Sequence, residues 1–103
     1  MARVEKTTEA TASLKEIGRY IAHQSQSRTV AERYLKRIEA KCEEYAEMPL
    51  MGEARPDLGK TVRCFTVQGH VVLYEPSDTG ILVLYVVHGA RDIPAVFRNV
   101  FRS

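Results

Sequence analysis

Two side chains that could take part in chemistry, His88 and Arg91, follow directly after the most apolar segment of the chain, residues 81–87. An imidazole gains and loses a proton near neutral pH, and a guanidinium holds a carboxylate or phosphate with parallel hydrogen bonds. A histidine and an arginine this close could therefore move a proton beside a bound anion. The alternative is structural: His88 hydrogen-bonds the turn at the end of a strand, and Asp92 stabilises that turn.

A second cation, Arg63, stands near the start of a predicted strand, residues 62–67. It could hold a phosphate, or it could pair with a loop carboxylate such as Asp57 and hold the loop against a sheet. Glu53, in the same loop, is a further candidate base, although a glutamate in a loop is more commonly just solvated. Arg63 therefore has two interpretations that the sequence alone leaves open.

The two cysteines, Cys42 and Cys64, have no companions and no spacing of the kind that binds zinc. Cys42 falls on the apolar stripe of a predicted helix, where a thiol behaves as a small hydrophobic residue. We therefore expect no disulfide, no metal and no cofactor.

The first half of the chain predicts two helices that form an antiparallel hairpin. The first is expected over residues 8–25, and the second ends before Pro49, because the residue before a proline avoids helical geometry. Thr29 followed by Glu32 is a capping box, which favours a start of the second helix at Thr29. Each helix has an apolar stripe with the period of one helical face: Ala10, Leu14, Ile17 and Ile21, then Ala31, Leu35, Ile38, Cys42 and Tyr45.

The second half predicts three antiparallel strands that cover the apolar face of the hairpin. They are expected over residues 62–67, 70–75 and 81–87, with a tight turn at Gln68-Gly69 and the third strand as the central one. Tyr74 and Tyr85 are then cross-strand neighbours. Residues 49–61 read as a loop, residues 2–6 as a weak strand candidate, and residues 93–103 as a short amphipathic helix. The pattern predicts an α+β fold of two layers.

Length and composition indicate the number of domains, the class of partner and the location of the protein. A chain of 103 residues is expected to form one domain, residues 1–103. Its net charge of +2 is evenly spread between the two halves and does not argue for nucleic-acid binding. Neither a secretory signal nor an apolar run of about 18 residues is present, so we expect a cytoplasmic protein that does not enter the membrane.

Several blocks together resemble the ParE/RelE superfamily of bacterial toxins, and the ParE branch most. They are LKEIGRYIA at residues 14–22, PLMGEARPDLG at 49–59, VRCF at 62–65 and HGARD at 88–92. The resemblance covers nearly the whole chain and keeps the order of the blocks. The second and fourth blocks are its specific parts, because helical stripes occur in countless proteins.

The resemblance implies the toxin of a type II toxin–antitoxin pair, neutralised by a small ParD-like antitoxin. The family fold is an N-terminal helical hairpin packed on a small, mainly antiparallel sheet, in which the N-terminal strand pairs with the central strand of the meander. Members of the ParE branch inhibit DNA gyrase and so block replication. Members of the RelE branch enter the ribosome and cut messenger RNA.

The residues favour an inhibitor that acts by binding over an endoribonuclease. Arg63 and Arg91 match arginine positions of the family, and with His88 they would form the site of an RNase. The aromatic position near the C-terminus, however, holds Phe97, which has no proton to give or take. We expect inhibition of gyrase without catalysis. The alternatives are a ribosome-dependent mRNA interferase and a non-toxic decoy that binds an antitoxin.

Contacts with the antitoxin or the target are expected on the flank of the hairpin and at the rim of the sheet. The antitoxin should lay an amphipathic helix and an extended segment along the toxin. No direct DNA binding is expected, because the chain lacks a basic recognition helix. The expected contact residues are Tyr20, Leu35, Arg63, Arg91 and Phe97.

Overall fold

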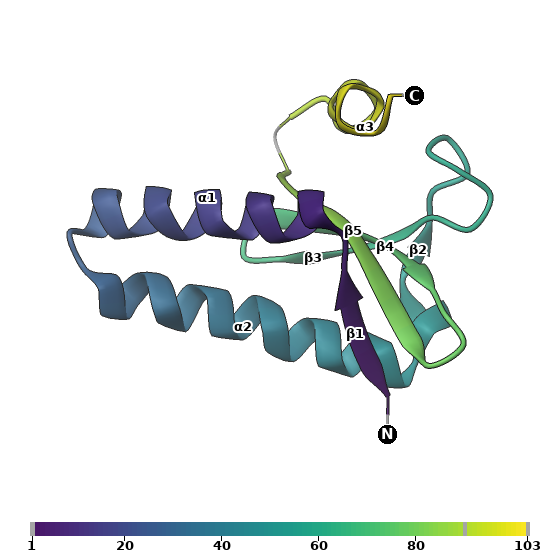
Figure 1. Ribbon diagram of the computed structural model, residues 1–103, viewed down its shortest axis with the longest axis horizontal. Helices are drawn as coiled ribbons and strands as arrows, with labels where there is room; N and C mark the ends of the chain where they lie inside the picture. The colour runs from purple at the N-terminus through teal and green to yellow at the C-terminus, as the bar shows by residue number, and fades with distance from the viewer. Residues whose placement is uncertain (1, 90, 103) are drawn as a thin grey trace.

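The computed structural model describes residues 2–89 and 91–102, and Figure 1 shows its arrangement. A helical hairpin packs on one face of a five-stranded sheet, and a third helix lies on the other face. The α+β fold with an N-terminal helical hairpin is confirmed, but the expectation of two layers was wrong, because the apolar side chains of the third helix cover the second face of the sheet. The elements are β1 (Arg3–Lys6), α1 (Thr8–Ser25), α2 (Arg28–Glu47), the 3₁₀ turn η1 (Pro49–Met51), β2 (Glu53–Ala54), β3 (Arg63–Val67), β4 (His70–Pro76), β5 (Gly80–His88) and α3 (Ile93–Phe101).

Both hairpin helices begin at a hydroxyl cap. The Thr7 side chain accepts a hydrogen bond from the Ala10 N–H, and the Ser27 side chain accepts one from the Val30 N–H. The expected start of α2 at Thr29 was therefore wrong, because Ser27 lies in extended backbone and caps the helix two residues earlier. In Figure 1 the connected end of the two helices extends well beyond the sheet.

The sheet has the strand order β1-β5-β4-β3-β2. β1 runs parallel to β5, and the other neighbours are antiparallel. The weak strand candidate at the N-terminus is confirmed as β1. The third predicted strand, β5, was expected to be the central one; it has a neighbour on each side, but β4 is the middle strand of the five. The expected loop contains the two-residue strand β2, which no hydrophobic pattern could indicate.

A bulge in the pairing of β4 with β5 places the tyrosines on opposite faces. Leu73 pairs with Tyr85, but Tyr74 pairs with Val83, so Leu84 is the extra residue. Tyr74 is buried under the hairpin, whereas Tyr85 lies under α3. The expectation that Tyr74 and Tyr85 are cross-strand neighbours was wrong, because the hydrophobic run of β5 contains no signal for the bulge.

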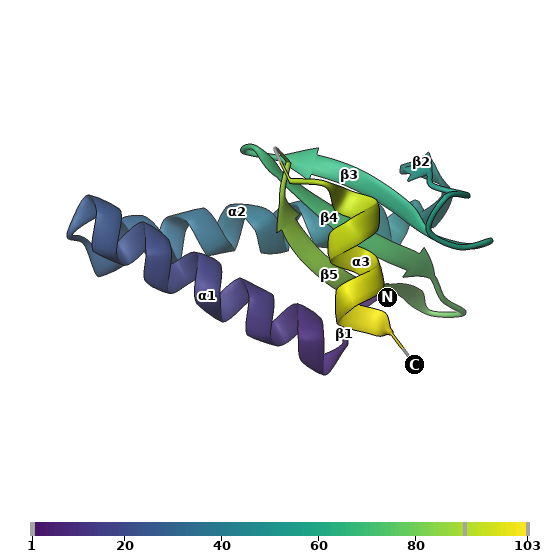
Figure 2. The ribbon, with the colours of Figure 1, turned by 90° about the horizontal axis from the view of Figure 1, so that it is seen from above.

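The two faces of the sheet form two apolar cores. The larger lies under the hairpin and includes Ile38, Val72 and Tyr74, all with 0% exposure. The smaller lies under α3, which crosses the sheet in Figure 2 and has no buried residue of its own. Within the described residues, no helix is long and apolar enough to cross a membrane.

Candidate functional site

A groove of about 670 Å³ lies where α1, the end of β5 and the start of α3 meet. Its residues come from parts of the chain that are distant in sequence. They are Ser13, Glu16, Ile17, Tyr20 and Ile21 of α1, Tyr34 of α2, Gln68 and His70, residues 85–88 of β5, Arg91, and Val96 of α3. We call this surface the groove.

Hydroxyl groups of Thr7 and Ser13 fix α1 against β5, along the part of its edge that lies beyond the end of β1. The Thr7 hydroxyl donates to the carbonyl of Leu84 at 2.7 Å. The Ser13 hydroxyl accepts from the N–H of Val86 at 3.2 Å and donates to the carbonyl of Ala10 at 2.8 Å. The bonds to Leu84 and Val86 give partners to backbone groups of β5 that lie beyond the residues paired with β1. They also set the position of the groove wall that carries Tyr20.

One end of the groove holds a cluster of three polar rings, Tyr34, His70 and His88. The Tyr34 hydroxyl lies 2.7 Å from the carbonyl of Gln68 and 2.6 Å from Nδ1 of His70. Because its single proton is donated to the carbonyl, Nδ1 of His70 must be the donor in the second bond. His70 and His88 are cross-strand partners, with ring centroids 5.4 Å apart.

This cluster favours an uncharged His70. Burial lowers the pKa of His70 below its ordinary value, and the neighbouring His88 lowers it further. Burial also raises the pKa of Tyr34. The arrangement therefore places a neutral imidazole, with Nε2 as its acceptor nitrogen, beside a second histidine and near Arg91.

His70 is the functional candidate that the sequence did not indicate. Its contact with Tyr34 joins residues 36 positions apart, and its pairing with His88 depends on the bulge in β5. The one available signal was the two-residue turn, which places His70 opposite Val67. His88, which the sequence did indicate, lies in the groove with a histidine neighbour.

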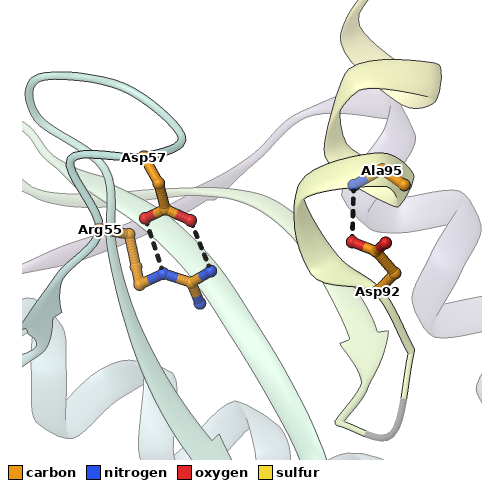
Figure 3. A network of polar contacts seen from close by, with 4 residues as sticks. All are labelled: Arg55, Asp57, Asp92 and Ala95. Carbon is orange, nitrogen blue, oxygen red and sulfur yellow. Dashed lines mark hydrogen bonds and ion pairs between the residues drawn. The ribbon is translucent and has the colours of Figure 1, made fainter.

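Arg63 holds the loop that follows α2, as one of its two interpretations required, but through other partners. Its Nη1 donates to the carbonyls of Leu50 at 3.1 Å and Gly52 at 2.7 Å. The expected pairing of Arg63 with Asp57 was wrong. Asp57 instead forms two hydrogen bonds with Arg55, at 3.0 and 2.9 Å, shown in Figure 3.

The Arg55–Asp57 pair lies within the loop, and its two charges are paired with each other. The Arg55 guanidinium lowers the pKa of the Asp57 carboxyl, and the hydrogen bonds to Asp57 raise the pKa of Arg55. Asp92 also has a structural role, since its carboxylate accepts from the N–H of Ala95 at 3.2 Å and caps α3 (Figure 3).

The expected contact residues fall in different places. Tyr20 is 63% exposed and lines the groove together with Arg91. Leu35 packs between the helices, where a β-carbon on Gly18 would lie 2.9 Å from its Cδ1. Phe97 packs into the smaller core beside Phe101, with ring centroids 4.8 Å apart. Arg63 lies at the far end of β3 from the groove.

Comparison with known proteins assigns the family. The family model of the ParE toxin of the type II toxin–antitoxin system parDE matches residues 4–93. The chain belongs to the ParE toxin family. It is thus a ParE-type toxin of a type II toxin–antitoxin system, as the motifs at residues 49–59 and 88–92 indicated.

A solved structure described as the chromosomal ParDE TA system from P. aeruginosa has the same fold. Its TM-score is 0.71 at 18% sequence identity, and the alignment covers 85% of this chain and 96% of that one. No curated protein sequence matches the chain.

The cysteines of this ParE-type toxin are buried thiols. Burial raises the pKa of Cys42 to about 12, and burial also raises the pKa of Cys64. Both are therefore protonated and unreactive near neutral pH. Among residues 2–89 and 91–102, no group of three or more histidine, cysteine, aspartate or glutamate side chains is placed to hold a metal ion.

Proposed function

We propose that this toxin inhibits DNA gyrase by binding and without catalysis, and that a ParD-like antitoxin occupies its groove in the cytoplasm. Family membership supports a toxin, and the separation of the two arginines supports binding over RNA cleavage. Cutting RNA needs an acid, a base and cations around one phosphate.

Arg63 and Arg91 do not approach one phosphate. Arg63 begins β3, whereas Val67, His70 and His88 pair across the other end of the ladder, and Arg91 follows in a turn whose N–H bonds the His88 carbonyl. The two ends of β3, at Arg63 and Val67, are four residues and therefore about 13 Å apart. In addition, the Arg63 guanidinium already donates to two carbonyls.

The groove has the chemistry of a peptide-binding surface. Apolar side chains of α1 and β5 form most of its walls, with the exposed ring of Tyr20 and the charge of Arg91 at its rim. A helix with an apolar stripe and an acidic edge would bury its stripe against the apolar walls and the Tyr20 ring, and its acidic edge would pair with Arg91. Tyr20 and Arg91 are therefore the contacts that we retain for the antitoxin.

The proposal is tested by a supercoiling assay with purified gyrase and the full chain. We expect inhibition that a ParD-like antitoxin reverses. Tyr20→Ser is expected to weaken the antitoxin complex while gyrase inhibition persists, and Tyr20→Phe is the matched control. Unchanged supercoiling at an excess of folded toxin would contradict the proposal. A chain that permits normal growth on induction would favour the decoy.

The histidine cluster favours one second candidate, ribosome-dependent cleavage of RNA. His70 and His88 could act as base and acid beside Arg91, all within the groove. This candidate predicts cut transcripts soon after induction, and their loss in His88→Gln. Arrest of replication with intact transcripts would exclude it.

A further inference from the structure

The segment after α2 presents three large apolar side chains to solvent. Met48, Leu50 and Met51 are 59%, 70% and 46% exposed. Exposed apolar residues usually occur singly on a protein surface, and a group of them marks an interaction site. We call these three residues the platform.

The backbone of the platform is held by two side chains from the sheet. The buried Tyr74 hydroxyl donates to the carbonyl of Pro49 at 2.6 Å, and the N–H of Gly52 donates to the same hydroxyl at 3.0 Å. Arg63 donates to the carbonyls of Leu50 and Gly52. The exposed side chains therefore stand on an ordered support, which reduces the entropy lost on binding.

Two exposed carboxylates, Glu47 and Glu53, flank the platform in the sequence, and α2, which leads into it, has its charges arranged against the helix dipole. Its first ten residues carry four cations and one carboxylate, and its last ten carry four carboxylates and one cation. A helix is stabilised by the opposite arrangement, with acidic residues first and basic residues last. Within the described chain, Glu47 and Glu53 on either side of the platform form no ion pair.

The platform and the groove lie at opposite ends of α2. Tyr34 lines the groove, and Met48 follows it by 14 residues. At about 1.5 Å per residue the two positions are about 21 Å apart. Substitutions in the platform therefore leave the residues of the groove unchanged, so the two surfaces can be tested separately.

We propose that the platform is the surface with which the toxin contacts its target, and that the target presents an apolar patch bordered by lysine and arginine. Proteins that hold DNA carry such basic surfaces, because they neutralise phosphates. The two carboxylates that flank the platform complement that charge. The inference rests on the proposed function in taking gyrase as the target.

The apolar arm of the test uses the full-length variant Leu50→Ser, with Val30→Ser as its control. Val30 is also an exposed apolar residue, 42% exposed, but it lies at the other end of α2. We expect the concentration for half-inhibition of supercoiling to rise at least about tenfold for Leu50→Ser. The denaturation midpoint and the affinity for the antitoxin should stay unchanged in both variants.

The charge arm uses the double variant Glu47→Gln/Glu53→Gln, with Glu32→Gln as a control on the same helix. Neutral glutamine keeps the size of the side chain and removes the charge. We expect weaker inhibition at low salt and a smaller loss of inhibition as salt is raised, because fewer charges remain to be screened.

Three results would overturn the inference. The first is that Leu50→Ser inhibits gyrase as strongly as the wild type. The second is that Leu50→Ser loses as much affinity for the antitoxin as it loses inhibition of gyrase. The third is that inhibition by the double charge variant depends on salt as it does in the wild type. If the wild-type chain arrests growth but leaves gyrase active, the proposed function fails. In that case the platform is judged by growth: if Leu50→Ser arrests growth as strongly as the wild type does, the platform is not the target surface. A wild-type chain with neither effect overturns both.

Discussion

The hydroxyl of Tyr74 accepts a hydrogen bond from the N–H of Gly52, 22 positions earlier in the chain, at 3.0 Å. Tyr74 has 0% exposure, so its ring passes through the larger core and its polar end emerges beneath the loop. The same oxygen donates to the carbonyl of Pro49. One buried tyrosine therefore connects the central strand of the sheet to the segment that exposes Leu50.

Tyr74→Phe is expected to destabilise the toxin by about 1–3 kcal/mol. The phenylalanine keeps the ring and leaves the Gly52 N–H and the Pro49 carbonyl without their partner. Urea denaturation followed by circular dichroism measures the change. Tyr45→Phe is the matched control: Tyr45 stacks on Phe65 at 4.0 Å between centroids and has no hydrogen bond among the described residues. An equal loss in both variants would contradict the interpretation.

Gly52→Ala should also destabilise the fold, by about 1–3 kcal/mol, because the space beside Gly52 is filled. A β-carbon there would overlap the Tyr74 hydroxyl and lie 2.7 Å from its Cε1. We expect the loss to shrink when Gly52→Ala is combined with Tyr74→Phe, since the hydroxyl makes the closest contact. Strictly additive free energies of unfolding in the double-mutant cycle would argue against direct contact.

The stability of the toxin should fall as the pH falls through about 6.5 because of His70. Folding lowers the pKa of His70 below its ordinary 6.5, so the unfolded chain binds more protons than the folded chain in this range. The loss begins near pH 6.5 and levels off once the folded state is protonated too. Well above that pH, His70 contributes nothing.

The measurement compares the free energy of unfolding at about pH 8 and about pH 5. His70→Gln is expected to reduce the difference, because it removes the titrating group and keeps a donor for the Tyr34 hydroxyl. His23→Gln, an exposed position in the last turn of α1, serves as the control. A pH dependence that is the same in wild type and His70→Gln would refute the role of burial at this histidine.

The helices and the three long strands could be predicted because their signals are local. The stripe of α1 and the turn at Gln68-Gly69 each lie within a few residues of sequence. The strand β1 has four residues and β2 has two, too few for a period to appear. The sequence offered β1 only as a weak candidate, which the resemblance to ParE toxins supported, and nothing in the sequence indicated β2.

The candidate site was less accessible to sequence reasoning because it depends on register. The pairing of His70 with His88 follows from a bulge at Leu84, and an unbroken apolar run gives no sign of where a strand gains a residue. Arg63 had its structural role recognised with the wrong partner. Its true acceptors are backbone carbonyls, which every residue carries and which no residue type can indicate.

Glu47→Gln is expected to stabilise the isolated toxin by about 0.3–1 kcal/mol while weakening inhibition of its target. Glu47 is the last residue of α2, where its carboxylate faces the negative end of the helix dipole, and no basic residue lies in that turn. Glutamine and glutamate have similar helix propensities, so the change isolates the charge. Denaturation at low salt measures the gain, which added salt should abolish by screening. Opposite signs for stability and inhibition would mean that the carboxylate is retained for binding, whereas a destabilised variant would show that Glu47 has a partner within the fold.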